Sequence, residues 1–156
     1  MNSYFFIIIL LALAAFFAIK ISIADFRRRI IPDAYLFPLM LIGLTLISFY
    51  SFPISIQSAT IGAIFGYLMA VIIGLIFEKI TSKNNQSGQS PIGMGDIKLI
   101  GVGGLWLGTY GLALALIIAC IIGTIWSKNK KQRFIPFAPF FLFGGFLSFI
   151  INLFLL

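Results

Sequence analysis

Residues 4–24 read YFFIIILLALAAFFAIKISIA, an apolar run that carries one charged side chain, Lys20. A helix of this length crosses the hydrocarbon core of a bilayer, which takes about 20 residues. No basic residue precedes the run, and its apolar part is longer than that of a removable secretory signal. We therefore expect a retained transmembrane helix at this point of the chain.

The same kind of apolar run recurs along the remaining sequence. Only 10% of the residues are charged and the mean hydropathy is +1.13, whereas soluble domains carry about a quarter charged residues. The sequence predicts an all-α integral membrane protein, a bundle of about six transmembrane helices that forms one polytopic domain over residues 1–156. The further spans are expected at residues 35–50, 56–77, 96–108, 110–126 and 134–156.

Two pairs of glycines suggest how these helices pack. Gly62 with Gly66, and Gly104 with Gly108, are each separated by three residues, a spacing that lets helix backbones approach closely. The one long polar connection, residues 78–93, is rich in Ser, Asn, Gln and Gly and is expected to be flexible.

Basic residues are distributed unevenly among the connections. Nine follow the first, third and fifth spans, and none follows the second or fourth. Since cationic connections stay in the cytoplasm, we expect a multi-pass protein of the plasma or inner membrane with both termini outside. The net charge of +7 then reflects orientation and contact with anionic membrane lipid, and no nucleic-acid partner is expected. The nine are Arg27, Arg28, Arg29, Lys79, Lys83, Lys128, Lys130, Lys131 and Arg133.

The absence of histidine excludes several kinds of active site. Ser-His-Asp and Cys-His triads and histidine-based metal sites cannot be built. The single cysteine, Cys120, cannot form an intrachain disulfide or a cysteine cluster, and we expect it to be a buried small side chain. No metal and no cofactor is predicted.

The four acidic residues are therefore the main candidates for chemistry. The topology brings Asp25 and Asp96, at the inner ends of the first and fourth spans, to the same side of the membrane. Two carboxylates that share a site do not both ionise readily, so one holds a proton and the other can activate water for peptide hydrolysis. Asp33 is interpreted as the N-cap of the second span, and Glu78 as a solvated loop charge.

The sequence around each carboxylate refines this prediction. Asp96 lies in PIGMGDIKL, residues 91–99, where Gly93 and Gly95 permit unusual backbone angles and close approach of a substrate. Asp96 would begin a helix, where the dipole favours an anion, while Asp25 ends one. We therefore expect Asp96 to be the more ionised member and Asp25 the more protonated. The simpler alternatives are a helix cap for Asp96 and charge balance for Asp25 beside the arginines.

Together these segments resemble the type IV prepilin and preflagellin peptidases, a family of membrane aspartic proteases. The resemblance rests on Asp25-Phe26-Arg27 leading to Ile31-Pro32-Asp33, on Gly93-Met94-Gly95-Asp96-Ile97-Lys98, and on the Pro-Phe-Ala-Pro stretch within residues 135–140. It implies Asp25 and Asp96 as the catalytic pair, with Gly93, Gly95 and Lys98 supporting them. It also implies prepilin-like substrates, cut between a short basic leader and a hydrophobic helix at the cytoplasmic side.

The resemblance is to a short form of the family. Larger members that also methylate the new N-terminus carry an added cytoplasmic region, often with Cys-x-x-Cys pairs, and neither is found here. N-methyltransferase activity is therefore not expected. Two other functions stay open: a small ion-coupled transporter or channel component that uses Asp25 and Asp96, and an assembly subunit without catalysis. No oligomeric state is specified by the sequence.

Overall fold

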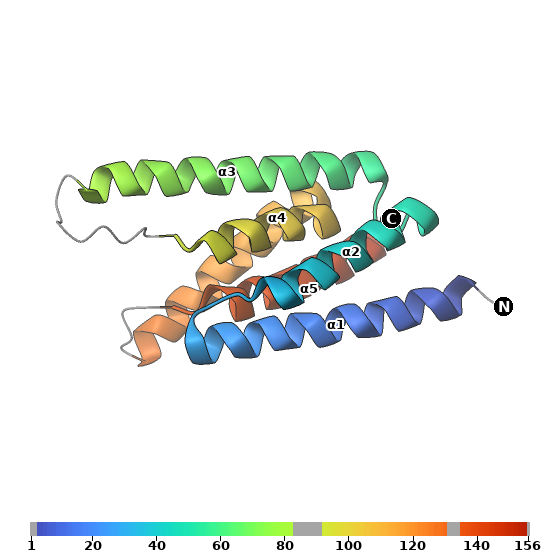
Figure 1. The fold of residues 1–156 in the computed structure, drawn as a ribbon, viewed down its shortest axis with the longest axis horizontal. Helices are drawn as coiled ribbons and strands as arrows, with labels where there is room; N and C mark the ends of the chain where they lie inside the picture. The colour runs from blue at the N-terminus through green and yellow to red at the C-terminus, as the bar shows by residue number, and fades with distance from the viewer. Residues whose placement is uncertain (1–2, 83–91, 131–134, 156) are drawn as a thin grey trace.

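The computed structural model describes residues 3–82, 92–130 and 135–155, and within these ranges the chain forms five α-helices (Figure 1). All five are long and apolar enough to cross a membrane, which confirms the predicted all-α fold of a multi-pass membrane protein. The helices are α1 (Ser3–Arg28), α2 (Asp33–Tyr50), α3 (Ile56–Ser82), α4 (Met94–Lys130) and α5 (Phe137–Leu155).

Helix α4 contains both the fourth and the fifth predicted span. A straight helix of 37 residues would be about 55 Å long. Yet Asp96 near its start interacts with Asp25, and Trp126 near its end packs against Phe26 with ring centroids 5.9 Å apart. Gly108 makes this possible, because its φ of 68° and ψ of −175° interrupt the helix, and Figure 1 shows α4 folding back there. The six expected spans are therefore found in five continuous helices of the described residues, because α4 carries the fourth and fifth spans on either side of its break at Gly108.

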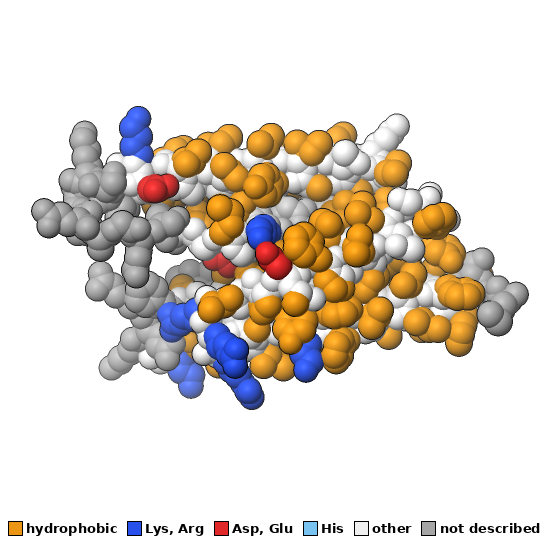
Figure 2. Space-filling model, in the orientation of Figure 1, with side chains coloured by type: hydrophobic (Ala, Val, Ile, Leu, Met, Phe, Trp, Pro, Cys, Tyr) orange, Lys and Arg blue, Asp and Glu red, His pale blue; other side chains and the backbone are white. Residues whose placement is uncertain are grey.

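The bundle has two distinct ends. Figure 1 shows the start of α1, the end of α5, the α2–α3 connection and the bend of α4 at one end. The α1–α2 connection, the end of α3, both ends of α4 and the start of α5 lie at the other. Figure 2 shows charged side chains gathered toward this second end and hydrophobic ones over the rest of the visible face. The basic residues at the described helix ends, Arg27, Arg28, Lys79, Lys128 and Lys130, therefore share one end, and its cytoplasmic location stays a prediction.

Glycines bring α3 and α4 into backbone contact, as predicted. A Cβ atom added to Gly62 would overlap the backbone of Gly104 and Gly108, and one added to Gly104 would overlap the backbone of Gly62. Small residues at a helix interface allow this close approach, which strengthens van der Waals packing inside a membrane.

Two smaller predictions about the helices were wrong. Cys120 is exposed on the outside of the bundle and not buried, because a surface that faces lipid accepts small apolar side chains as readily as a core does. Glu78 lies within α3 and not in a loop, although its side chain is exposed as expected. Residues 83–91 of the expected flexible connection lie outside the described part of the chain.

Candidate active site

Asp25 lies in the last turn of α1 and joins that helix to α5. Its side chain is only 5% exposed. The backbone N–H of Ala138 donates a hydrogen bond to its Oδ2 atom over 2.8 Å, and the N–H of Phe137 is a second donor. The first N–H groups of a helix have no partner within that helix, so Asp25 satisfies two donors at the start of α5. Arg29 also interacts electrostatically with the carboxylate, and its backbone N–H bonds to the Asp25 carbonyl oxygen over 2.8 Å.

Asp96 is the third residue of α4, which confirms that it lies at the start of a helix. Its side chain is half-buried and folds back toward Gly93, whose backbone N–H acts as a donor to the carboxylate. In return the N–H groups of Asp96 and Ile97 bond to the Gly93 carbonyl oxygen over 3.0 and 3.2 Å. The first turn of α4 therefore fixes this side chain locally.

The structure brings the two carboxylates together. Asp25 and Asp96 are close enough to interact electrostatically, although no Cα atom of α1 lies within 8 Å of a Cα atom of α4 in the described residues. The two side chains thus approach each other across a gap between their helices. Among the described residues, no three Cys, Asp or Glu side chains are grouped as metal ligands. What the two side chains themselves offer is proton transfer by a pair of carboxylates.

The expected difference in protonation between the two carboxylates assumed that Asp96 lies at the start of a helix and Asp25 only at the end of one. Asp25 does lie at the end of α1, but its carboxylate also accepts hydrogen bonds at the start of α5. Both side chains therefore lie beside the N-terminal turn of a helix, and helix dipoles do not distinguish them.

Asp33 and Lys98 have roles that the sequence did not predict. Asp33 is not the N-cap of α2, since Pro32 holds that position and no side chain caps the helix. Asp33 is instead the first residue of α2, and both of its carboxylate oxygens accept hydrogen bonds from Lys98 Nζ, over 3.0 and 2.7 Å. Both side chains are partly exposed. The two residues are 65 positions apart, so the sequence around either one does not predict that they pair. The ion pair depends on how α2 and α4 pack.

The motif glycines differ from expectation as well. Of the described residues, Gly108 is the glycine with positive φ, so Gly93 and Gly95 are not used for unusual backbone angles. Gly95 matters for packing, because a Cβ added there would lie 2.9 Å from the Cβ of Ile31. It lets the start of α4 approach the α1–α2 connection.

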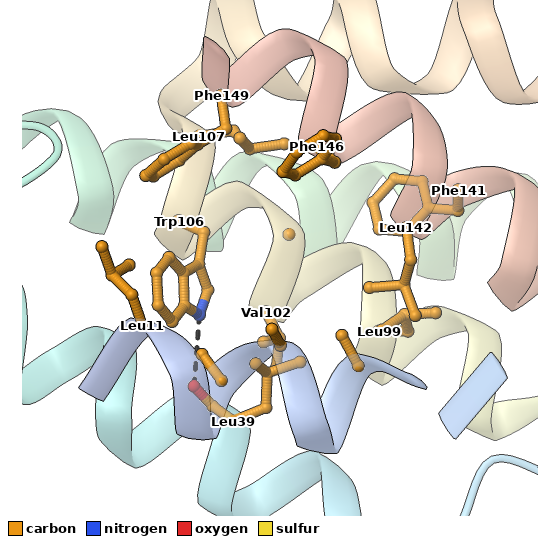
Figure 3. A pocket seen from close by; sticks show the side chains of 15 residues that line it. Leu11, Leu39, Leu99, Val102, Trp106, Leu107, Phe141, Leu142, Phe146 and Phe149 are labelled. Atoms are coloured by element: carbon orange, nitrogen blue, oxygen red, sulfur yellow. Dashed lines mark hydrogen bonds between the residues drawn. The ribbon is translucent and has the colours of Figure 1, made fainter. Parts of the chain in front are cut away.

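An apolar groove lies between the helices that carry the two carboxylates. It has a volume of about 290 Å³ and runs between α1, α2, the first half of α4 and α5. Figure 3 shows its labelled side chains, with the indole N–H of Trp106 donating to the Leu39 carbonyl oxygen over 3.1 Å. On each of three helices, one lining residue lies within two turns of a residue of the site. Ala18 precedes Asp25 on α1, Leu99 follows Asp96 on α4, and Phe141 follows Ala138 on α5. The helices that carry the site thus also form the groove.

Fold and site together define a polytopic membrane protein with two neighbouring carboxylates at one end of its helices, one buried and one half-buried. The type IV leader peptidase family model matches residues 5–127, and the chain belongs to this family. Membership implies an aspartic-type peptidase and agrees with the resemblance noted in the sequence.

Named relatives agree with this assignment. Proteins named prepilin leader peptidase/N-methyltransferase are similar over most of this chain: 31% identical in Dichelobacter nodosus, 33% in Burkholderia pseudomallei strain 1026b and 29% in Neisseria gonorrhoeae. The matches cover 85%, 86% and 87% of the chain but only 45%, 45% and 46% of those proteins. The chain therefore spans less than half the length of these relatives. No solved structure gives a significant match.

Proposed function

We propose that this chain is a membrane aspartic endopeptidase that removes the leader peptide of prepilin-like precursors. The observation that carries the proposal is the meeting of Asp25 and Asp96 from separate helices at one end of the bundle. In the proposed reaction the ionised carboxylate takes a proton from water, and the water oxygen attacks the scissile carbonyl carbon. The protonated carboxylate donates a hydrogen bond to the carbonyl oxygen, and the C–N bond breaks as the leaving nitrogen gains a proton.

The surroundings of the pair support this choice of substrate. The basic connections gather at the same end as the carboxylates, and by the positive-inside rule this end faces the cytoplasm. The groove between the helices that carry the pair has an apolar lining, which suits a substrate whose scissile bond borders a hydrophobic segment. Prepilin-like proteins, pseudopilins and flagellin-like precursors have this arrangement according to the family resemblance.

The second candidate function is an ion-coupled transporter or channel component. It requires the carboxylates to lie far apart or on an open path across the membrane. The electrostatic contact between Asp25 and Asp96 at one end of the bundle favours the peptidase.

The test is to reconstitute the purified chain in lipid vesicles with a precursor that has a basic leader followed by a hydrophobic helix. We expect mass spectrometry to show one cut between leader and helix, and the vesicles to hold a proton or sodium gradient as well as protein-free ones do. A precursor with the hydrophobic helix replaced by a polar sequence is the matched control and should stay uncut. An intact precursor together with rapid loss of the gradient would establish the transporter instead.

A further inference from the structure

The separation of the two carboxylates depends on other helices. Helix α1 packs against α2 and α5, whereas α4 packs against α2, α3 and α5, and the backbones of α1 and α4 do not touch in the described residues. Whatever fixes α4 to α2 therefore also sets the position of Asp96 relative to Asp25.

The α1–α2 connection ties Asp25 to the start of α2. Arg29 follows α1 with a φ of 54°, and its N–H bonds to the Asp25 carbonyl oxygen. Two residues later Ile31 is buried and contacts the position of Gly95 on α4. Asp33 then begins α2. Residues 29–33 thus connect Asp25 to Ile31 and Asp33, the two residues that the start of α4 contacts.

Besides the packing of Gly95 on Ile31, the start of α4 makes a second contact with this region through Lys98. Its Nζ atom binds both carboxylate oxygens of Asp33, two residues after Asp96. Side chains two positions apart on a helix point in directions about 160° apart. Lys98 therefore faces α2 while Asp96 faces Asp25, so Lys98 acts on the candidate site through the backbone of α4.

We propose that the Asp33–Lys98 ion pair is a clamp that positions Asp96 relative to Asp25 for peptide hydrolysis. The inference rests on the proposed function for its consequence, but the clamp itself is a property of the fold. Both residues are positioning residues and not catalytic ones. An ion pair with two short hydrogen bonds fixes the direction as well as the distance of a contact, and small errors in the placement of reacting groups reduce the rate strongly.

The first test is the kinetics of cleavage by the full chain in vesicles. Lys98→Met removes the charge and keeps most of the stem, and we expect kcat to fall about tenfold or more, with KM changed by less than about twofold. Lys98→Arg should restore most of kcat. Asp33→Asn should have a similar effect, and the double variant Asp33→Asn/Lys98→Met should be no slower than the slower single variant, because the two residues act as one unit. Lys128→Met, near the C-terminal end of α4, is the matched control and should behave like the parent.

The second test does not use proteolysis. Hydrogen exchange by mass spectrometry should show faster exchange in a peptide covering residues 94–100 of Lys98→Met, with no change in residues 138–146. Lys98→Arg should match the parent. Unchanged exchange in Lys98→Met would overturn the clamp, and so would parental kcat in that variant. A parent chain that cuts no precursor would contradict the proposed function alone, and the exchange of residues 94–100 would still decide whether the clamp exists.

Discussion

The two ends of the bundle hold their helices together by different means. At the end that carries Asp25 and Asp96, polar side chains join separate helices: Asp25 to the start of α5, and Asp33 on α2 to Lys98 on α4. Toward the other end, α3 and α4 meet through glycine backbones at Gly62 and Gly104. A polar contact at that end, from the Ser148 hydroxyl to the Gly111 carbonyl oxygen over 2.9 Å, involves no charged side chain. Polar links fix the orientation of individual side chains, whereas glycine contacts fix only the distance between helices. This difference suits the proposed function, in which the chemistry is confined to the end that carries Asp25 and Asp96.

The largest expected effect concerns the side of the membrane on which each end lies. The test uses a Cys120→Ser background with one new cysteine at a time. Lys128→Cys marks the end of the bundle that carries Asp25 and Asp96. Tyr110→Cys marks the bend of α4, where the parent side chain is 93% exposed. A membrane-impermeant maleimide should label position 128 in inside-out vesicles and position 110 in intact spheroplasts, because cationic connections stay in the cytoplasm. Labelling with the two positions exchanged would reverse the topology and place the carboxylates outside.

The glycine contact should be sensitive to a single methyl group. We expect Gly62→Ala to destabilise the folded protein by about 3 kcal/mol, at the upper end for overpacked sites, since its Cβ meets backbone that cannot move aside. Gly74→Ala on the same helix is the control: its Cβ would meet only Ile97 Cδ1 at 3.8 Å, and alanine favours a helix by about 1 kcal/mol over glycine. Thermal unfolding in detergent compares the two. Equal stability would show that the close approach of α3 and α4 contributes little.

The polar link from Asp25 should also affect stability, but less. Asp25→Ala leaves two N–H groups of α5 without a partner and should cost about 1–3 kcal/mol. Asp25→Asn keeps an acceptor oxygen for the Ala138 N–H and should be closer to the parent. Thermal unfolding in detergent measures the stability of both Asp25 variants. Glu78→Ala, a substitution of an exposed acidic residue, is the control. If Asp25→Ala were as stable as Asp25→Asn, the bond to α5 would have no role in holding that helix.

The smallest expected effect is on methyl transfer. The relatives whose names include N-methyltransferase are more than twice as long as their match to this chain. We propose that residues 1–156 by themselves cleave without methylating, because the family resemblance implies that methyl transfer goes with an added cytoplasmic region. Mass spectrometry of the product, after incubation with S-adenosylmethionine, should show an unmodified N-terminus. An added methyl group would assign a second activity to these helices.

The sequence predicts the helices and the acidic pair well, because both depend on local or additive signals. Apolar length defines the spans, and the distribution of basic residues by itself assigns Asp25 and Asp96 to the same end. Features that depend on the meeting of distant segments were missed: the Asp33–Lys98 pair, the hydrogen bond from Ala138 to Asp25, and the packing of Gly95 on Ile31. The break after the fourth span was predicted from the sequence at residues 108–111, and the structure has it at Gly108, where the backbone is not helical.

The central claim is that Asp25 and Asp96 act together on one peptide bond. The most direct measurement compares precursor cleavage by the parent, Asp25→Asn and Asp96→Asn, with unfolding curves to confirm that all three are folded. The account predicts that either substitution lowers the cleavage rate by at least about a thousandfold, because an amide replaces a group that must transfer or hold a proton. Full cleavage by either folded variant would contradict it.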